Sequence, residues 1–393
     1  MPTRRRFVQA SAAAAALSSA ANAAKTEPTL ANASVYTRLG VNPVINGMGT
    51  VTVLGGSLMP PEVVRAMEEA SRHFIHLPEL QKKAGERLAE LCSVPAAMVT
   101  TGAAGAITCA TAACVTRGSR RRLAMLPDTD GLPNEVIQQK AHHSGYEAQI
   151  RLTGAKIIEV ETSEELERAI GPRTAMLFYL NKAENHGKIQ RKQFLEIAKR
   201  HKVPAFNDAA ADVPPSRRLG SIVEEGFDLV AFSGGKGIRG PQASGLLLGR
   251  KDLIEAAQQS ISPAGGIGRG MKVGKEEIIG LVAAVERFLK FDHEAEARML
   301  DARVAEMIKL LSGVKDVETS REVPEIANEV PHCRIRWTGK KTGKQVHAEL
   351  LNGDPPIATL LQGERSILVS VWMMRGNEHR TAARRLKEIL ESA

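Results

Sequence analysis

A lysine stands among glycines directly after a short apolar run. Residues 229–232 are Leu-Val-Ala-Phe, and Ser233, two glycines and Lys236 follow them. A buried strand that ends in such a turn would hold the lysine on a rigid base and let a ligand approach the backbone closely. A lysine amine placed in this way can be deprotonated and can condense with an aldehyde. The alternative is a solvated lysine on a flexible surface loop.

An aspartate and a glycine-rich turn follow two earlier apolar runs. Asp208 comes just after residues 203–206, and taken alone it is equally consistent with the N-cap of a helix. Residues 97–100 lead into a turn that contains Gly102, Ala103 and Ala104 and opens a segment of small residues. A helix that starts there offers free N–H groups and its dipole to a phosphate. The turn lacks the Walker and GxGxxG patterns, and plain packing is as common for a Gly/Ala turn as ligand binding.

The elements that must position these residues alternate along the chain. Short apolar runs lie at 97–100, 156–160, 175–179, 203–206, 229–232 and 245–248, and amphipathic segments such as 164–170 and 191–201 separate many of them. This pattern predicts an α/β domain with a mainly parallel sheet, in which ligands bind beyond the carboxyl ends of the strands.

The C-terminal part of the chain predicts a smaller α+β domain. A long helix is expected from residue 275 to 294 and beyond, followed by strands near 333–337 and 367–372 and a closing helix over 377–391. We therefore divide the chain into a signal peptide (1–24), an N-terminal arm (25–60), a large domain (61–285) and a small C-terminal domain (286–393).

The order of phosphate-type turn, aspartate and lysine resembles the fold-type-I enzymes that depend on pyridoxal 5′-phosphate (PLP), the aspartate aminotransferase superfamily. Within it, the chain is similar to the group that contains bacterial selenocysteine synthase and D-glucosaminate-6-phosphate ammonia lyase. The matching segments are 44–47, 80–85, 101–104, 232–236, 240–242 and 267–277. The resemblance covers about residues 35 to 300 well and the C-terminal domain loosely, and residues 372–378 depart from the family's usual ending.

The resemblance implies roles for individual residues. Lys236 would carry PLP as a Schiff base, and Asp208 would keep the pyridine nitrogen protonated so that the ring accepts electrons. The phosphate would be bound by Gly102, Ala103, Ala104 and Ser233.

Further positions are implied in the same way. His143 or His142 would stack on the cofactor ring, although each is nearly as consistent with a solvent-exposed histidine at a helix start. Arg269 and Lys272 would bind anions of the substrate or the cofactor, and Asn185, between Glu184 and His186, would lie in an active-site loop.

The family resemblance implies a PLP-dependent lyase that acts on an amino acid or amino sugar acid by α,β-elimination with release of ammonia, through Lys236. A racemase, aldolase or aminotransferase on the same scaffold is the alternative, and a cofactor-binding relic without turnover is a second one. Fold-type-I sites usually form between subunits, so a homodimer or larger homo-oligomer is expected by analogy.

The amino-acid composition limits which classes of molecule this protein is expected to bind. Lys and Arg number 53 against 44 Asp and Glu, which gives a net charge of +9, yet aromatic residues make up only 4%. Without a basic stripe interleaved with stacking rings, a nucleic-acid partner is not expected, and a small anionic amino substrate explains the charge. The four cysteines show no zinc spacing, so no metal is expected.

The N-terminus has the order of an export signal. Arg4, Arg5 and Arg6 precede an alanine-rich stretch over 10–17, and residues 21–23 offer a small-x-small cleavage site. This resembles a twin-arginine signal and predicts a periplasmic or otherwise exported protein, with no stable membrane anchor because the apolar stretch is short. The alternative is a disordered or mitochondrial-type presequence.

Overall fold

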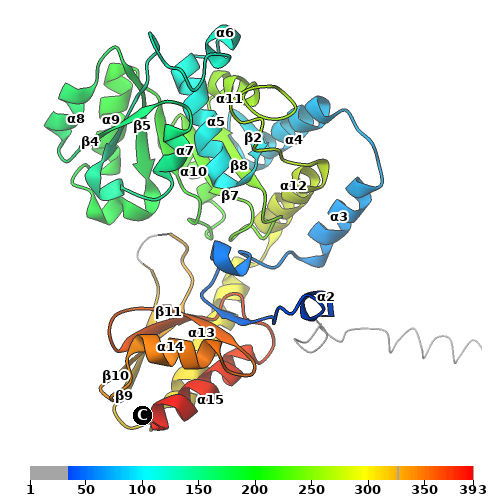
Figure 1. Ribbon diagram of the computed structural model, residues 1–393, viewed down its shortest axis with the longest axis vertical. Coiled ribbons are helices and arrows are strands. Elements are labelled where there is room, and N and C mark those ends of the chain that lie inside the picture. Colours follow the sequence, from blue (N-terminus) through cyan, green and yellow to red (C-terminus); the bar gives the residue numbers. More distant parts are fainter. Residues whose placement is uncertain (1–33, 325–326, 393) are drawn as a thin grey trace, which may run out of the picture.

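The computed structural model describes residues 34–324 and 327–392. The predicted signal peptide and the start of the predicted arm lie outside the described residues. Two regions, each with its own sheet and hydrophobic core, lie one above the other in Figure 1. No helix within the described residues has the length and apolarity that a membrane crossing requires.

The larger region is built on a sheet of seven strands in the order β2-β8-β7-β6-β5-β3-β4. Only β8 runs against its two neighbours, and the other pairings are parallel. The strands are β2 (Ala96–Thr100), β3 (Glu135–Gln139), β4 (Lys156–Val160), β5 (Thr174–Leu180), β6 (Ala205–Asp208), β7 (Leu229–Ser233) and β8 (Gly245–Gly249). The prediction of an α/β fold with a mainly parallel sheet is confirmed.

Helices surround this sheet (Figure 1). They are α3 (Pro61–Ser71), α4 (Leu77–Cys92), α5 (Gly102–Thr116), α6 (Arg120–Leu123), α7 (Glu147–Arg151), α8 (Ser163–Ala169), α9 (Arg191–His201), α10 (Arg218–Glu224), α11 (Lys251–Gln258) and α12 (Lys275–Lys290). Helix α5 is buried almost all round, which its run of Gly, Ala, Thr and Cys permits because small side chains allow the sheet and the neighbouring helices to approach on every side. This buried helix begins at the carboxyl end of β2.

The smaller region has a five-stranded sheet in the order β1-β11-β12-β10-β9. Its elements are β1 (Ile45–Gly47), α13 (His293–Leu311), β9 (Val317–Glu322), β10 (His332–Trp337), α14 (Gly343–Leu351), β11 (Ile357–Leu361), β12 (Ser366–Ser370) and α15 (Glu378–Glu391). Strand β1 pairs in parallel with β11, and Ile45 is part of the small region's core. Part of the predicted N-terminal arm is therefore a strand of the small sheet; the arm also contains α2 (Ser34–Thr37) and the short helix η2 (Thr52–Leu54).

The long helix predicted from residue 275 onward is two helices, and that prediction is wrong. Helix α12 ends at Lys290, and Phe291 has extended backbone angles. Asp292 then caps α13, because its Oδ1 accepts a hydrogen bond from the Ala295 N–H at 2.8 Å. The apolar periodicity continues across this break, so periodicity alone could not locate it.

The two regions also touch through a small-region loop. The Arg218 guanidinium donates to the carbonyl of Ala327 and pairs with Glu329 at 2.8 Å. The Glu329 N–H donates to the Pro214 carbonyl at 3.3 Å, and the Asn328 amide donates to the Ala211 carbonyl at 3.4 Å. The loop between β9 and β10 is thus held against the loop that follows β6.

Candidate active site

Lys236 and Asp208 lie at the same edge of the large sheet. Strands β6 and β7 are parallel neighbours, with Asp208 in register with Ala231. Asp208 is the last residue of β6, and Lys236 follows β7, which ends at Ser233. Both functional groups therefore stand at the carboxyl ends of adjacent strands, where this class of sheet binds ligands.

The loop that carries Lys236 is fixed by hydrogen bonds rather than flexible. The Gly234 N–H donates to the Ser244 carbonyl at 2.9 Å, and the Gly240 N–H donates to the Gly234 carbonyl at 2.7 Å. From the N-terminal arm, the Ser57 N–H and hydroxyl both donate to the Gly235 carbonyl at 3.0 Å. The surface-loop alternative for this lysine does not fit these contacts.

Asp208 is a buried carboxylate, not a helix cap. The helix that follows it, α10, begins only at Arg218. Its Oδ1 accepts a hydrogen bond from the Ala210 N–H at 3.1 Å. Burial raises the pKa of Asp208, while that hydrogen bond and the charges of Lys236 and Lys182 oppose the rise.

Burial has the opposite effect on the amine. It lowers the pKa of Lys236, and the charge of Asp208 only partly offsets that change. A lysine whose protonated form is disfavoured is available as a nucleophile or a base near neutral pH. Lys236 can therefore attack an aldehyde or take up a proton.

The glycine-rich turn forms a helix start near the same edge. Gly102 has φ of +71°, which a glycine adopts without strain, and it is the first residue of α5. The first N–H groups of a helix, here those of Gly102, Ala103 and Ala104, have no partner within the helix and can bind a phosphate. Ser233 is half-buried, and its N–H donates to the Ala210 carbonyl at 3.3 Å.

These residues fit PLP. A buried carboxylate suits a protonated ring nitrogen, an amine of lowered pKa suits an aldehyde, and a helix start suits a phosphate. A groove of about 460 Å³ opens at Lys236, within the size range of small-molecule sites. Its lining comes from both regions: residues 48–53, Tyr146, Ala211, Lys236, Asn328, His332, Ser370 and Trp372.

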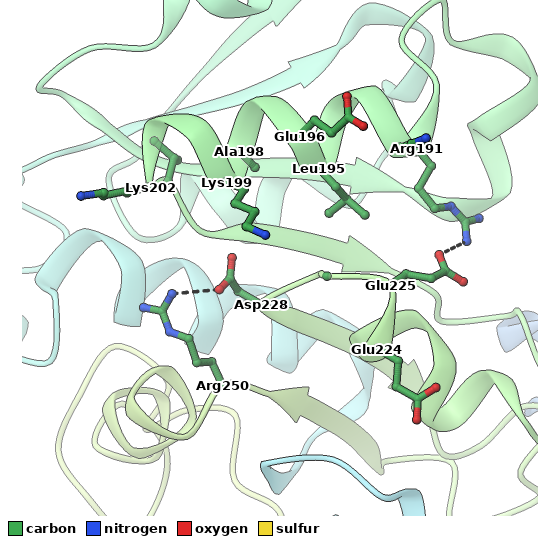
Figure 2. A pocket seen from close by; sticks show the side chains of 13 residues that line it. Arg191, Leu195, Glu196, Ala198, Lys199, Lys202, Glu224, Glu225, Asp228 and Arg250 are labelled. Atoms are coloured by element: carbon green, nitrogen blue, oxygen red, sulfur yellow. Dashed lines mark hydrogen bonds and ion pairs between the residues drawn. The ribbon is translucent and has the colours of Figure 1, made fainter.

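A larger pocket of about 830 Å³, shown in Figure 2, lies at the opposite edge of the sheet. Its lining includes Val203 and Asp228, which precede β6 and β7, and Arg250, which follows the antiparallel β8. Asp228 pairs with Arg250 at 2.8 Å, so these two charges satisfy each other. Lys236 does not line this pocket, and we place the chemistry in the smaller groove.

The structure separates the two histidines. His142 is fully buried, accepts a hydrogen bond from the Leu180 N–H at 3.1 Å on Nδ1, and packs its edge against Tyr179 with ring centroids 4.5 Å apart. Burial lowers the pKa of His142 to about 4, so the ring is neutral at pH 7. His142 is a core residue and is not free to stack on a cofactor.

His143 faces outward. Its side chain is 69% exposed, and its Nδ1 lies 2.7 Å from Glu147 Oε1 and 3.7 Å from Glu159 Oε1. It does not line the groove, whereas Tyr146 does. Tyr146 is therefore an aromatic ring at the groove that sequence reasoning did not select.

Three predicted substrate residues lie outside the groove. Arg269 and Lys272 are exposed on the segment 262–274. That segment packs on α5, because a Cβ on Gly105 would lie 3.9 Å from Met271 Sδ, which places it beside the helix start. Asn185 lines a separate pocket of about 220 Å³.

Two charged residues at the site were not selected from the sequence. Asp212 is only 1% exposed, and burial, followed by the charge of Asp208, raises the pKa of its carboxyl to about 6. Lys182 follows β5, and its charge acts on both Asp208 and Lys236. The only sequence signal for either was its position just beyond an apolar run.

The chain is similar to several known proteins. The family model for L-seryl-tRNA selenium transferase matches residues 148–317. The D-glucosaminate-6-phosphate ammonia lyase of Salmonella typhimurium is 32% identical over 335 residues, 82% of this chain and 88% of that protein. The 5′-C-glycyluridine monooxygenase-decarboxylase of a Streptomyces species is also 32% identical, over 86% of this chain and 83% of its own length.

Solved structures give the same grouping. That of D-glucosaminate-6-phosphate ammonia-lyase matches with a TM-score of 0.79 at 31% identity, over 91% of this chain and 98% of the other. A NifS-like protein matches with a TM-score of 0.59 at 16% identity over 89% of this chain and 100% of the other, which shows a shared fold. The chain therefore belongs to the family of fold-type-I, PLP-dependent enzymes that contains D-glucosaminate-6-phosphate ammonia lyase and L-seryl-tRNA(Sec) selenium transferase.

Proposed function

We propose that this enzyme is a lyase that acts on an amino acid or amino sugar acid with a β-hydroxyl group. The β-hydroxyl leaves as water to give an enamine, and hydrolysis of the enamine takes that water up again, so that ammonia and a 2-keto acid are the products. The observation that carries the proposal is the groove at Lys236 with a buried carboxylate beside it, in a chain 32% identical over 335 residues to an ammonia lyase. The racemase, aldolase and aminotransferase alternatives are not favoured by these relatives.

The residues of the groove have separate tasks in this proposal. When bound, PLP supplies an electron sink that stabilises negative charge on the substrate's α-carbon. Lys236 is the attachment point and, once free, the base that takes the α-proton onto Nζ. Asp208 would hold the ring nitrogen, and the start of α5 with Ser233 would hold the phosphate. Tyr146, which lines the groove, is the candidate for contact with the ring's face.

The substrate class follows from the charges near the site. Lys182 acts on the Asp208–Lys236 pair, and Arg269 and Lys272 are exposed on the segment beside the start of α5. Exposed cations near a site attract an anionic substrate even where they do not line the groove itself. We propose that the substrate carries at least one acidic group besides its amine.

A substrate panel tests the proposal. PLP-loaded protein would be given D-glucosaminate, its 6-phosphate and both isomers of serine, and we expect keto acid and ammonia in equal amounts from at least one of them. Lys236→Ala should lower the rate by about 100-fold or more, because it removes the proton acceptor. Lys251→Ala, at an exposed lysine on α11, should leave the rate unchanged.

One result would contradict the lyase assignment, and another would contradict the attachment of PLP at Lys236. Consumption of O2 with release of CO2 would instead match the chemistry in the name of the Streptomyces relative. Borohydride reduction of the PLP-loaded protein, followed by digestion, should place the pyridoxyl label on the peptide that contains Lys236, and a label on another lysine would contradict the attachment point.

We also propose that the enzyme is exported through its twin-arginine-type N-terminus and works as a homo-oligomer. The support for export is the sequence of residues 1–24. Cell fractionation should find the protein in the periplasm with the signal peptide of residues 1–24 removed. Replacing both Arg4 and Arg5 by lysine should retain it in the cytoplasm, and periplasmic recovery of that variant would contradict this route.

A further inference from the structure

A second buried carboxyl lies beside the Asp208–Lys236 pair. Asp212 is 1% exposed, and its Oδ1 has no hydrogen-bond partner within the part of the chain that the structure describes. Burying a carboxyl oxygen without a partner is costly, so a fold that keeps one at a cofactor site points to an electrostatic task.

The loop that carries Asp212 is fixed against the loop that carries Lys236. The Asp212 N–H donates to the Ala209 carbonyl at 3.1 Å, and the Asp212 carbonyl accepts a hydrogen bond from Arg218 Nη1 at 3.0 Å. Next to it, Val213 packs so closely on Gly237 that a Cβ on Gly237 would overlap the Val213 carbonyl. Each loop thus restrains the backbone of the other next to Asp212 and Lys236.

The groups around Asp212 come from four elements. Burial raises the pKa of Asp212 to about 6, and the charge of Asp208 at the end of β6 adds to the rise. Arg218 on α10, the Asn181 amide of the helical turn η4 (Asn181–His186) and Lys236 after β7 act in the opposite direction. Above pH 6 the Asp212 carboxyl is mostly ionised, and below pH 6 it is mostly protonated.

This arrangement matters once the cofactor is attached. Asp208 would then pair with the protonated ring nitrogen, whose positive charge would offset that of the carboxylate at Lys236. Among the groups that act on Lys236, Asp212 is the remaining anion, while Lys182 acts as a cation. A nearby negative charge favours the protonated form of a nitrogen.

We propose that Asp212 is a positioning residue whose carboxylate keeps a proton on the Lys236 nitrogen when that nitrogen is joined to the cofactor. The carboxylate neither gains nor loses a proton in this role, and it touches no substrate atom. The inference rests on the proposed attachment at Lys236.

The test is the pH dependence of the visible absorbance of PLP-loaded protein, which reports the protonation of the lysine-bound cofactor. In Asp212→Asn the midpoint should move down by about one pH unit relative to wild type, because the counter-charge is gone. Asp228→Asn is the matched control, since Asp228 lies at the opposite edge of the sheet and should leave the midpoint in place.

Unchanged or raised midpoints in Asp212→Asn overturn the inference. Asp212→Ser is a second neutral variant, needed if the first fails a circular-dichroism check of its fold, and it should shift the midpoint in the same direction. Asp212→Glu keeps the charge and should keep the wild-type midpoint, and a midpoint like that of the neutral variants contradicts the proposal.

Failure of the underlying function gives a different result. If Lys236 is not the attachment point, reductive labelling marks another residue in the wild-type protein itself. If only the role of Asp212 is wrong, Lys236 carries the label in wild type and variant alike, and the two absorbance midpoints coincide.

Discussion

Gly237 packs against the carbonyl of Val213 with no room for a side chain, so that a Cβ there would overlap the carbonyl oxygen and lie 3.2 Å from the ring of Trp372. Gly237 follows Lys236 directly, Val213 follows Asp212, and Trp372 belongs to the small region. Three parts of the chain that are distant in sequence therefore meet at the residue that follows Lys236.

We predict that Gly237→Ala displaces Lys236. The added methyl group must push apart the two loops, which should cost about 1–3 kcal/mol of unfolding free energy and lower the amount of PLP retained per chain. Thermal unfolding and the visible absorbance of dialysed protein measure both effects. Gly265→Ala is the control, because a Cβ at Gly265 has nothing within 4 Å. Equal behaviour of the two variants would contradict the tight contact.

The pH dependence of stability contains two opposing contributions in cofactor-free protein. Asp212 has a pKa raised from 3.8 to about 6, so its stabilising contribution is present at low pH and is lost as pH rises through 6. His142 has a pKa lowered from 6.5 to about 4, so its contribution is present above pH 6.5 and is lost as pH falls toward 4. Each amounts to about 3 kcal/mol, with opposite sign over nearly the same window.

Single variants should separate these contributions. Asp212→Asn should leave a stability that rises with pH between 4 and 6.5, whereas His142→Phe should leave one that falls with pH between about 4 and 6. Denaturant unfolding at several pH values measures the slopes. Parallel slopes in the two variants would show that these groups are not the ones that titrate.

Asn46 should control the order of the arm that lines the groove. Its Oδ1 accepts hydrogen bonds from the N–H groups of Met48 and Gly49 at 2.9 and 3.1 Å, and its Nδ2 donates to the Gly49 carbonyl at 2.9 Å. Asn46→Ala should raise KM more than it lowers kcat and destabilise the arm by about 1–2 kcal/mol. Asn134→Ala, remote from the groove, should leave KM unchanged.

The N-terminal part of the described chain should form the contact between subunits. Of the fifteen large apolar side chains that are exposed among the described residues, ten lie between residues 35 and 75, and Phe74 is fully exposed. Apolar surface concentrated in this way marks an interaction site. Light scattering should give a dimer or larger for wild type and a smaller species for Phe74→Ser. Leu351→Ser, at an exposed leucine of the small region, is the control, and a wild-type monomer would contradict the proposal.

The sequence predicts which edge of the large sheet carries the site, but not how the loops at that edge orient their side chains. Lys236 and Asp208 could be placed because each follows an apolar run, and parallel strands bring their carboxyl ends together. His142 and His143 could not be separated, because both follow β3 and the 3₁₀ turn η3 (Lys140–His142) decides which ring points inward. Asp212 was missed because its burial depends on contacts with Arg218 and the lysine loop, which no local pattern encodes.

The pairing of β1 with β11 has a consequence for the order in which the protein can form. Ile45 lies opposite Ile357, so the sheet of the small region cannot be completed until nearly the whole polypeptide has left the ribosome. Contacts between such distant parts of a chain are slow to form, and until then β1 has an unpaired edge. Translation has therefore almost finished before β1 can pair with β11.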